Sequence, residues 1–122
     1  MKIAIPCRHN LVSPVLEEAT EFIIVEMENS NYVNNARIDL NGKSPVQKLQ
    51  YLVDTGVDMI LCGAVSNSYI NSITAKGLEV VAWLKGDVDE ILQAYISGKL
   101  NGERFRMPGR KRCRCRHRRA NY

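Results

Sequence analysis

The feature that most constrains the fold of this chain is a regular alternation of helical and strand-like segments in its second half. Residues 44–56, 66–77 and 87–98 carry apolar side chains at helical spacing, whereas 58–62 and 78–84 are short apolar runs. Strands that alternate with helices pair in parallel, and right-handed crossovers place helices on both faces of the sheet. The apolar face of the first helix is expected to consist of Val46, Leu49, Leu52 and Val53.

The first half of the chain reads as three strands with little helix. Residues 2–6, 22–25 and 37–40 have strand character, and proline is expected to end the first of them. The pair Ser13–Pro14 predicts a short helix with Ser13 as its N-cap. Because the polar stretch 29–35 predicts a tight turn, at least one pairing among these strands should be antiparallel.

Charge divides the chain into two parts. Residues 1–103 contain 8 Lys/Arg and 13 Asp/Glu, whereas residues 104–122 contain 9 Lys/Arg and no acid. We therefore predict one α/β domain at 1–103 and a basic, arginine- and cysteine-rich tail at 104–122, which cannot bury an apolar face and should be disordered. No apolar run approaches the roughly 20 residues that span a bilayer. With no secretory signal, a cytoplasmic protein with reduced thiols and no membrane partner is expected.

Two cysteines follow predicted strands at the end where open α/β sheets bind ligands. Cys7 and His9 lie just beyond the first strand, and Cys62 and Gly63 lie at the end of the fourth. If those strands are neighbours, the two thiols flank one crevice, where soft sulfur ligands suit a metal–sulfur compound. The alternatives are a small buried hydrophobe for Cys62, an inert loop thiol for Cys7 and a solvated histidine for His9.

Two serines are candidates for the same crevice. Ser66 is a predicted cap of the helix after Gly63, and the amino end of that helix would attract an anion. Ser13 caps a helix in one interpretation, and in the other its hydroxyl also contacts the ligand. The two interpretations of Ser13 are compatible.

The tail carries its own candidate sites. Cys113, Cys115 and His117 fall within five positions and could bind zinc or copper(I). The alternative is a solvated basic tail with incidental cysteines. Its nine cations would also bind a polyanion such as nucleic acid, with strong salt dependence and little sequence preference. Enzyme signatures such as G-x-S-x-G, a Walker loop or G-x-G-x-x-G are absent from the sequence, so we expect a binding protein and not an enzyme.

Taken in order, several segments resemble the dinitrogenase iron–molybdenum cofactor biosynthesis family. The resemblance covers nearly the whole chain and is carried by Met1–Pro6, Val12–Val15, Phe22–Val25, Gly56–Ser66, Gly77–Val80, Tyr95–Leu100 and Phe105–Gly109. Members often continue after the Ser-Pro-Val segment with phenylalanine, glycine, arginine and alanine. This chain has Leu16–Ala19, with two glutamates, at that place.

The resemblance implies both a fold and a role. The fold would be a ribonuclease-H-like three-layer α/β fold with a five-stranded mixed sheet, order 3-2-1-4-5, strand 2 antiparallel and helices on both faces. The role would be a nitrogen-fixation accessory or carrier that binds a metal–sulfur cluster of iron, molybdenum or both, and exchanges it with cofactor donor or acceptor proteins. The crevice at the strand ends then predicts that the cofactor binds at Cys7, His9, Ser13, Cys62, Gly63 and Ser66.

Overall fold

The computed structural model describes residues 1–28, 31–97 and 113–116. Its elements along the chain are β1 (Lys2–Arg8), β2 (Leu11–Val12), the short 3-10 helix η1 (Leu16–Glu18), β3 (Glu21–Glu28), β4 (Asn31–Asp39), α1 (Pro45–Thr55), β5 (Met59–Leu61), α2 (Asn67–Ala75), β6 (Glu79–Ala82), α3 (Val88–Ile96) and β7 (Cys113–Arg116). The predicted α/β class is confirmed.

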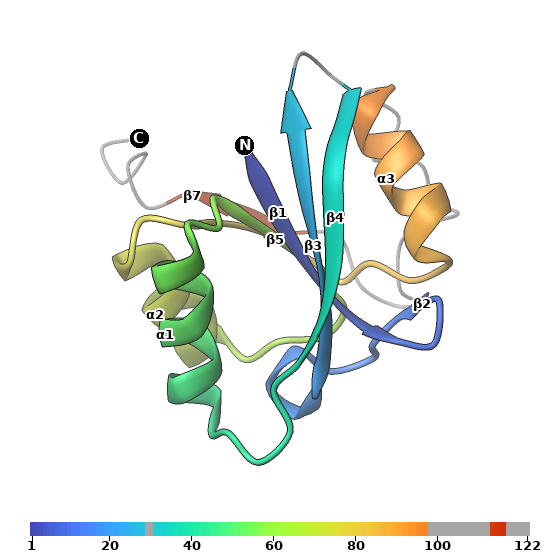
Figure 1. The fold of residues 1–122 in the computed structure, drawn as a ribbon. Helices are drawn as coiled ribbons and strands as arrows, with labels where there is room; N and C mark the ends of the chain where they lie inside the picture. Colours follow the sequence, from blue (N-terminus) through green and yellow to red (C-terminus); the bar gives the residue numbers. More distant parts are fainter. Residues whose placement is uncertain (29–30, 98–112, 117–122) are drawn as a thin grey trace.

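One mixed sheet joins all the strands (Figure 1). Its order is β4-β3-β1-β5-β6-β7, and β2 pairs with β1 beside this path. β1 pairs in parallel with β5, and β5 with β6, as predicted for the second half of the chain. β3 is antiparallel to both β1 and β4, as predicted for the second strand.

The predicted number of strands, five, is wrong. Within the described residues the sheet has seven strands, and its full order differs from the predicted order because β2 and β7 join it. β7 lies within the segment 104–122 that we expected to be disordered, and it pairs antiparallel with β6. The other residues of that segment lie outside the described residues. Strand β7 was missed because alternating arginine and cysteine has no apolar periodicity of its own.

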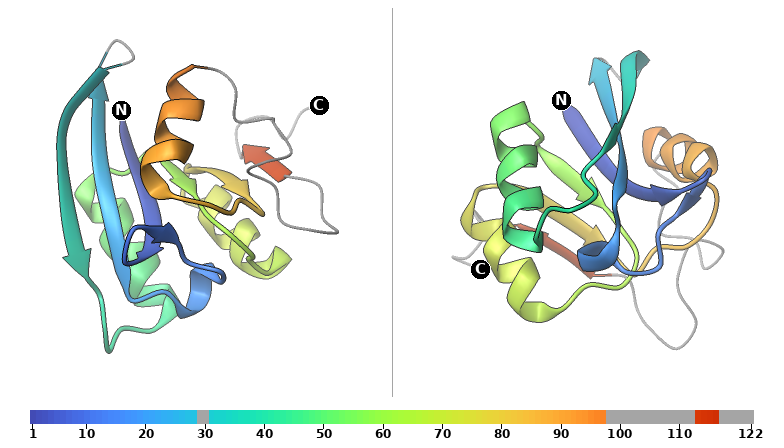
Figure 2. Two further views of the ribbon diagram at one scale, coloured as in Figure 1. Left: turned by 90° about the vertical axis from the view of Figure 1, so that its right-hand side faces the viewer. Right: turned by 60° about the horizontal axis from the view of Figure 1, so that its bottom comes forward.

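Helices cover both faces of the sheet, as predicted. Helices α1 and α2 pack on one face and α3 packs on the other (Figures 1 and 2). Alternate residues of each strand therefore enter different cores. In the central strand β1, Ala4 belongs to the core under α1 and α2, whereas Ile3 and Ile5 belong to the core under α3.

The first helix begins as its sequence predicts. Ser44 and Gln47 form a capping box in which each side chain accepts the other residue's backbone N–H. Leu49 and Leu52 are buried, but Val46 is 75% exposed, so its predicted place on the apolar face is wrong. Among the described residues, no helix combines the length and the apolar character that crossing a membrane requires.

Two other local predictions are wrong. β1 continues through Pro6, which pairs with Phe22 of β3, and ends only at Arg8. Ser13 does not cap a helix, because the short η1 begins after Val15 and has no side-chain cap. Pairing of β1 with β3 overrides the strand-ending signal of Pro6. The Ser13 N–H donates to the Pro6 carbonyl of β1, so the segment at Ser13–Pro14 does not begin a helix.

We expect Leu52→Ala to lower the free energy of unfolding by about 2–5 kcal/mol, because it leaves a cavity in the core under α1. Leu52 is 1% exposed. The matched control is Val46→Ala in the same helix, which should change the free energy by less than about 0.5 kcal/mol. Urea denaturation of both variants measures the difference, and equal losses would contradict the burial described above.

Candidate functional site

A cavity of about 530 Å³ opens where β1 ends and β3 begins, and we refer to it as the Cys7 pocket. The turn between β1 and β2, the segment leading to η1, and the first residue of β3 form its walls. It is lined by Cys7, Arg8, His9, Ser13, Pro14, Val15, Glu18, Ala19, Thr20 and Glu21. Three of the six residues predicted to bind a cofactor, Cys7, His9 and Ser13, therefore share one pocket.

The thiol of Cys7 sits in a defined polar environment. Cys7 is 3% exposed and lies in β1 opposite Glu21 of β3. The Arg37 side chain reaches across from β4, and its Nη1 donates to Cys7 Sγ at 3.4 Å and to the His9 carbonyl oxygen at 3.0 Å. The same Nη1 lies 3.7 Å from a carboxylate oxygen of Glu21. Arg37 thus holds the thiol and the turn that follows it.

Charge and burial act on the Cys7 thiol in opposite directions. Burial raises the pKa of Cys7 above its ordinary value, Arg37 lowers this pKa, and Glu21 raises it. Burial is the largest of the three effects, so the thiol is protonated at neutral pH. A metal ion that binds this sulfur must therefore displace its proton.

His9 lines the pocket from the turn after β1, and Ser13 lines it from the position after β2. His9 has a positive φ of 58°, which the tight turn between β1 and β2 imposes, and its side chain is exposed. Ser13 is 8% exposed; its backbone N–H donates to the Pro6 carbonyl at 2.9 Å and its hydroxyl lies 3.5 Å from the Val15 carbonyl. Both residues thus line the same cavity as Cys7.

The structure does not bring Cys62 to this pocket. β1 and β5 are neighbours, as predicted, with Ala4 opposite Ile60. Cys62 is 0% exposed in the same core as these two residues, under α1 and α2, whereas Cys7 belongs to the core under α3. The two cysteines therefore face opposite sides of the sheet, because side chains alternate along a strand and the register sets the phase.

Gly63 packs against the backbone of Ser13 and Pro14, two residues that line the pocket. A Cβ at this position would lie 2.6 Å from the Ser13 carbonyl oxygen and 2.7 Å from that of Pro14. The close approach lets the Ala64 N–H donate to the Pro14 carbonyl at 2.8 Å, and the Leu16 N–H to the Ala64 carbonyl at 2.9 Å. Gly63 is therefore positioned for backbone packing, and it fixes the segment that carries Ser13.

The amino end of α2 holds an internal carboxylate. Ser66 is the N-cap, as predicted, and its hydroxyl accepts from the Tyr69 N–H. Glu17 accepts from the Ser66 N–H at 3.0 Å and from the Ser66 hydroxyl at 2.7 Å. Glu17 thus occupies the place where we predicted an external anion.

The phenol of Tyr69 lies near the same helix end. Burial, as the largest effect, and the charges of Glu17 and Cys62 together raise the pKa of Tyr69 to about 12.

The predicted metal ligands of the tail are only partly described. Cys113 and Cys115 lie in β7, opposite Ala82 and Val80 of β6. His117 lies outside the described residues. Within the described part of the chain, no group of three or more His, Cys, Asp or Glu side chains is placed to hold a metal ion.

Sequence analysis did not single out Arg37, the residue that organises the Cys7 pocket. A signal was present, because Arg37 is the only lysine or arginine between Arg8 and Lys43. Its contact with Cys7 could not be inferred, since it depends on the register that sets Arg37 opposite Ile23 of β3.

One family model matches most of the chain, and the chain is also similar to a curated protein and to solved structures. The model of the family described as "Dinitrogenase iron-molybdenum cofactor" matches residues 1–98. An uncharacterized protein of Methanocaldococcus jannaschii is 25% identical over 105 residues, which are 82% of this chain and 89% of that protein. Two solved structures share the fold. PH0822 gives a TM-score of 0.79 at 22% identity, over 84% of this chain and 95% of that one. The apo form of the orange protein from Desulfovibrio gigas gives 0.66 at 21% identity, over 80% and 88%.

Arg37→Gln and Glu21→Gln are expected to move the pKa of Cys7 in opposite directions. Loss of Arg37 removes a cation that stabilises the thiolate, so the pKa rises further. Loss of the Glu21 charge removes a repelling anion, so the pKa falls.

The pKa can be followed by ultraviolet absorbance of the thiolate during a pH titration. The background protein should keep Cys7 as its one cysteine, with alanine at Cys62, Cys113 and Cys115. A shift of the same sign in both variants, or no shift in either, would contradict the environment described for this thiol.

Proposed function

The chain belongs to the dinitrogenase iron-molybdenum cofactor family, and we propose that it is a carrier or accessory protein that binds a metal–sulfur cofactor in the Cys7 pocket. The observation that carries this proposal is that Cys7, His9 and Ser13, which have thiol, imidazole and hydroxyl side chains, line one cavity. Thiol and imidazole are ligands that iron, copper and related metals prefer. A volume of about 530 Å³ lies within the range of pockets that hold cofactors.

Coordination supplies more of the affinity than net charge does in this proposal. Arg8 lines the pocket and Arg37 contacts its thiol, but Glu18 and Glu21 line the same cavity. Two cations and two carboxylates leave the pocket close to neutral, so an anionic cluster gains little from long-range attraction. The bond from a metal to the Cys7 sulfur, and a further bond to the His9 imidazole, would then fix the cofactor.

We infer a binding role in place of catalysis. The cofactor is cargo that donor proteins load and acceptor proteins remove, and an exposed His9 at the rim suits such exchange. The structural neighbour from Desulfovibrio gigas is described as an apo form, which supports a ligand-binding role for this fold. We also assign the three-layer arrangement to the ribonuclease-H-like class. The polyanion and the zinc or copper(I) hypotheses for the tail stay predictions.

Cys7→Ser is expected to lower cofactor loading at least about tenfold, because it removes the sulfur ligand. The full-length protein would be purified without oxygen and then exposed to tetrathiomolybdate, or to ferrous iron with sulfide. Bound molybdenum, iron and acid-labile sulfide are measured together with the visible spectrum. Cys62→Ala is the matched control and should load like the unchanged protein, since Cys62 faces the other core.

Loading should also depend on pH. A metal must displace the Cys7 proton, whose pKa is raised, so affinity should rise about tenfold for each pH unit between pH 6 and pH 8. Substitution of Cys113 and Cys115 by serine tests the tail separately. Equal loading of the Cys7→Ser variant would refute the proposed site, and loss of metal only in the tail variant would move the site to the tail.

A further inference from the structure

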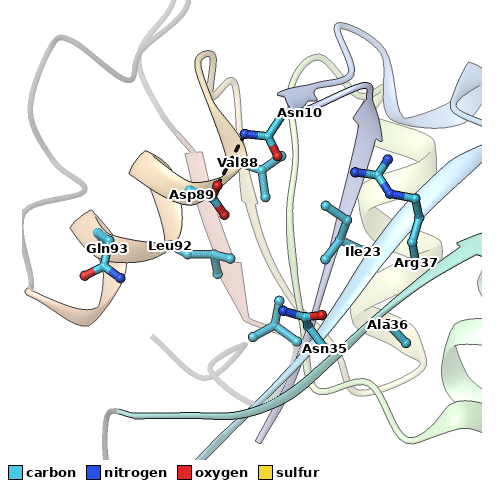
Figure 3. A pocket seen from close by; sticks show the side chains of 10 residues that line it. Asn10, Ile23, Asn35, Ala36, Arg37, Val88, Asp89, Leu92 and Gln93 are labelled. Atoms are coloured by element: carbon cyan, nitrogen blue, oxygen red, sulfur yellow. Dashed lines mark hydrogen bonds between the residues drawn. The ribbon is translucent and has the colours of Figure 1, made fainter.

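A second cavity, of about 350 Å³, lies on the α3 side of the sheet, and we refer to it as the α3 groove. Helix α3 forms one wall, and strands β3 and β4 form the other (Figure 3). It is lined by Asn10, Ile23, Val25, Asn35, Ala36, Arg37, Val88, Asp89, Leu92 and Gln93. Its volume is at the lower end of the range for small-molecule sites. Apart from Arg37, no residue that lines this groove takes part in the proposed cofactor function.

The two walls of the groove carry opposite charges. Asp89 projects from α3 beside Asn10, whose amide nitrogen lies 3.4 Å from Asp89 Oδ2 and 2.7 Å from Asp87 Oδ2. Arg37 projects from β4 on the other side (Figure 3). Since Asn10 uses its nitrogen for these carboxylates, its amide oxygen is left as an acceptor beside Asp89. The Asp89 side can therefore receive a cation, and the Arg37 side an anion.

Apolar side chains separate these charged ends. Val88 and Leu92 of α3 are 1% and 2% exposed, and Val25 of β3 is 1% exposed. Ile23 is half-buried and lies in Figure 3 between the β4 wall and the helix. A ligand that spans the groove must place hydrocarbon over this floor.

We propose that the α3 groove binds a small zwitterion with an aliphatic side chain, of the class of free α-amino acids. Its carboxylate would pair with Arg37, and its ammonium group with Asp89 and the Asn10 amide oxygen. A ligand with only one charge forms only one of these two ion pairs, so the groove favours a ligand that carries both charges. The aliphatic side chain would pack on the half-buried Ile23.

Arg37 can serve this ligand while it holds the Cys7 pocket. Its contacts with Cys7 Sγ, the His9 carbonyl and Glu21 all use Nη1. A carboxylate can pair with the other edge of the guanidinium, formed by Nε and Nη2, because the group presents donors along both edges. The amino-acid site therefore does not require the Cys7 thiol or a bound metal.

The test uses L-leucine as the probe, with full-length protein and isothermal titration calorimetry. Leucinamide, which lacks the carboxylate, and 4-methylpentanoate, which lacks the ammonium group, should each bind at least about tenfold more weakly than leucine. Asp89→Asn and Arg37→Gln should each weaken leucine binding by at least about tenfold. Glu90→Gln is the matched control, because Glu90 neighbours Asp89 in α3 but does not line the groove, and its affinity for leucine should not change.

Two further measurements separate a loss of binding from a loss of folding and from failure of the cofactor proposal. Thermal unfolding of each variant shows that it is folded. Cys7→Ser should bind leucine like the unchanged protein, so failure of the cofactor proposal leaves this one standing, and the reverse also holds. No binding of leucine at about 10 mM, equal binding by Asp89→Asn, or equal binding of leucinamide would overturn the proposal.

Discussion

Strand β1 lies at the centre of the sheet, bonded to β3 on one side and to β5 on the other, and the rest of the structure depends on this double pairing. The pairing holds β1 extended through Pro6 as far as Arg8, and so carries Cys7 to the rim of a pocket. It also sets the phase of the side chains. Ile3, Ile5 and Cys7 enter the core under α3, while Ala4 enters the core under α1 and α2. One residue of slip would exchange these faces and bury the thiol elsewhere.

The Glu17 carboxylate occupies a place where an external anion could otherwise bind. Glu17 accepts two hydrogen bonds from Ser66 at the amino end of α2, where the helix would otherwise attract an anion. This glutamate belongs to the Leu16–Ala19 stretch, which follows the Ser-Pro-Val segment. The Glu17 carboxylate already compensates the positive end of the α2 dipole, so this end is not a candidate site for an external anion. The candidate ligand site lies instead in the Cys7 pocket.

Arg37 connects the Cys7 pocket with the α3 groove. It contacts the thiol and the turn of the Cys7 pocket, and it lines the α3 groove. Its position at the edge strand β4 allows both, since only β3 pairs with that strand among the described residues. A residue shared in this way couples the charge of one cavity to that of the other, because any ligand that draws on the guanidinium alters the field at the Cys7 thiol.

The sequence by itself determined the elements whose signals are local. These are the alternation of helices and strands after residue 44, the capping box at Ser44, the Ser66 cap and the helices on both faces of the sheet. Local signals did not reveal β2, β7 or the exposure of Val46. The tertiary structure alone decided that Cys7 and Cys62 lie on opposite faces and that Arg37 reaches the thiol. Strand register sets these contacts, and it is fixed by packing between segments far apart in the chain.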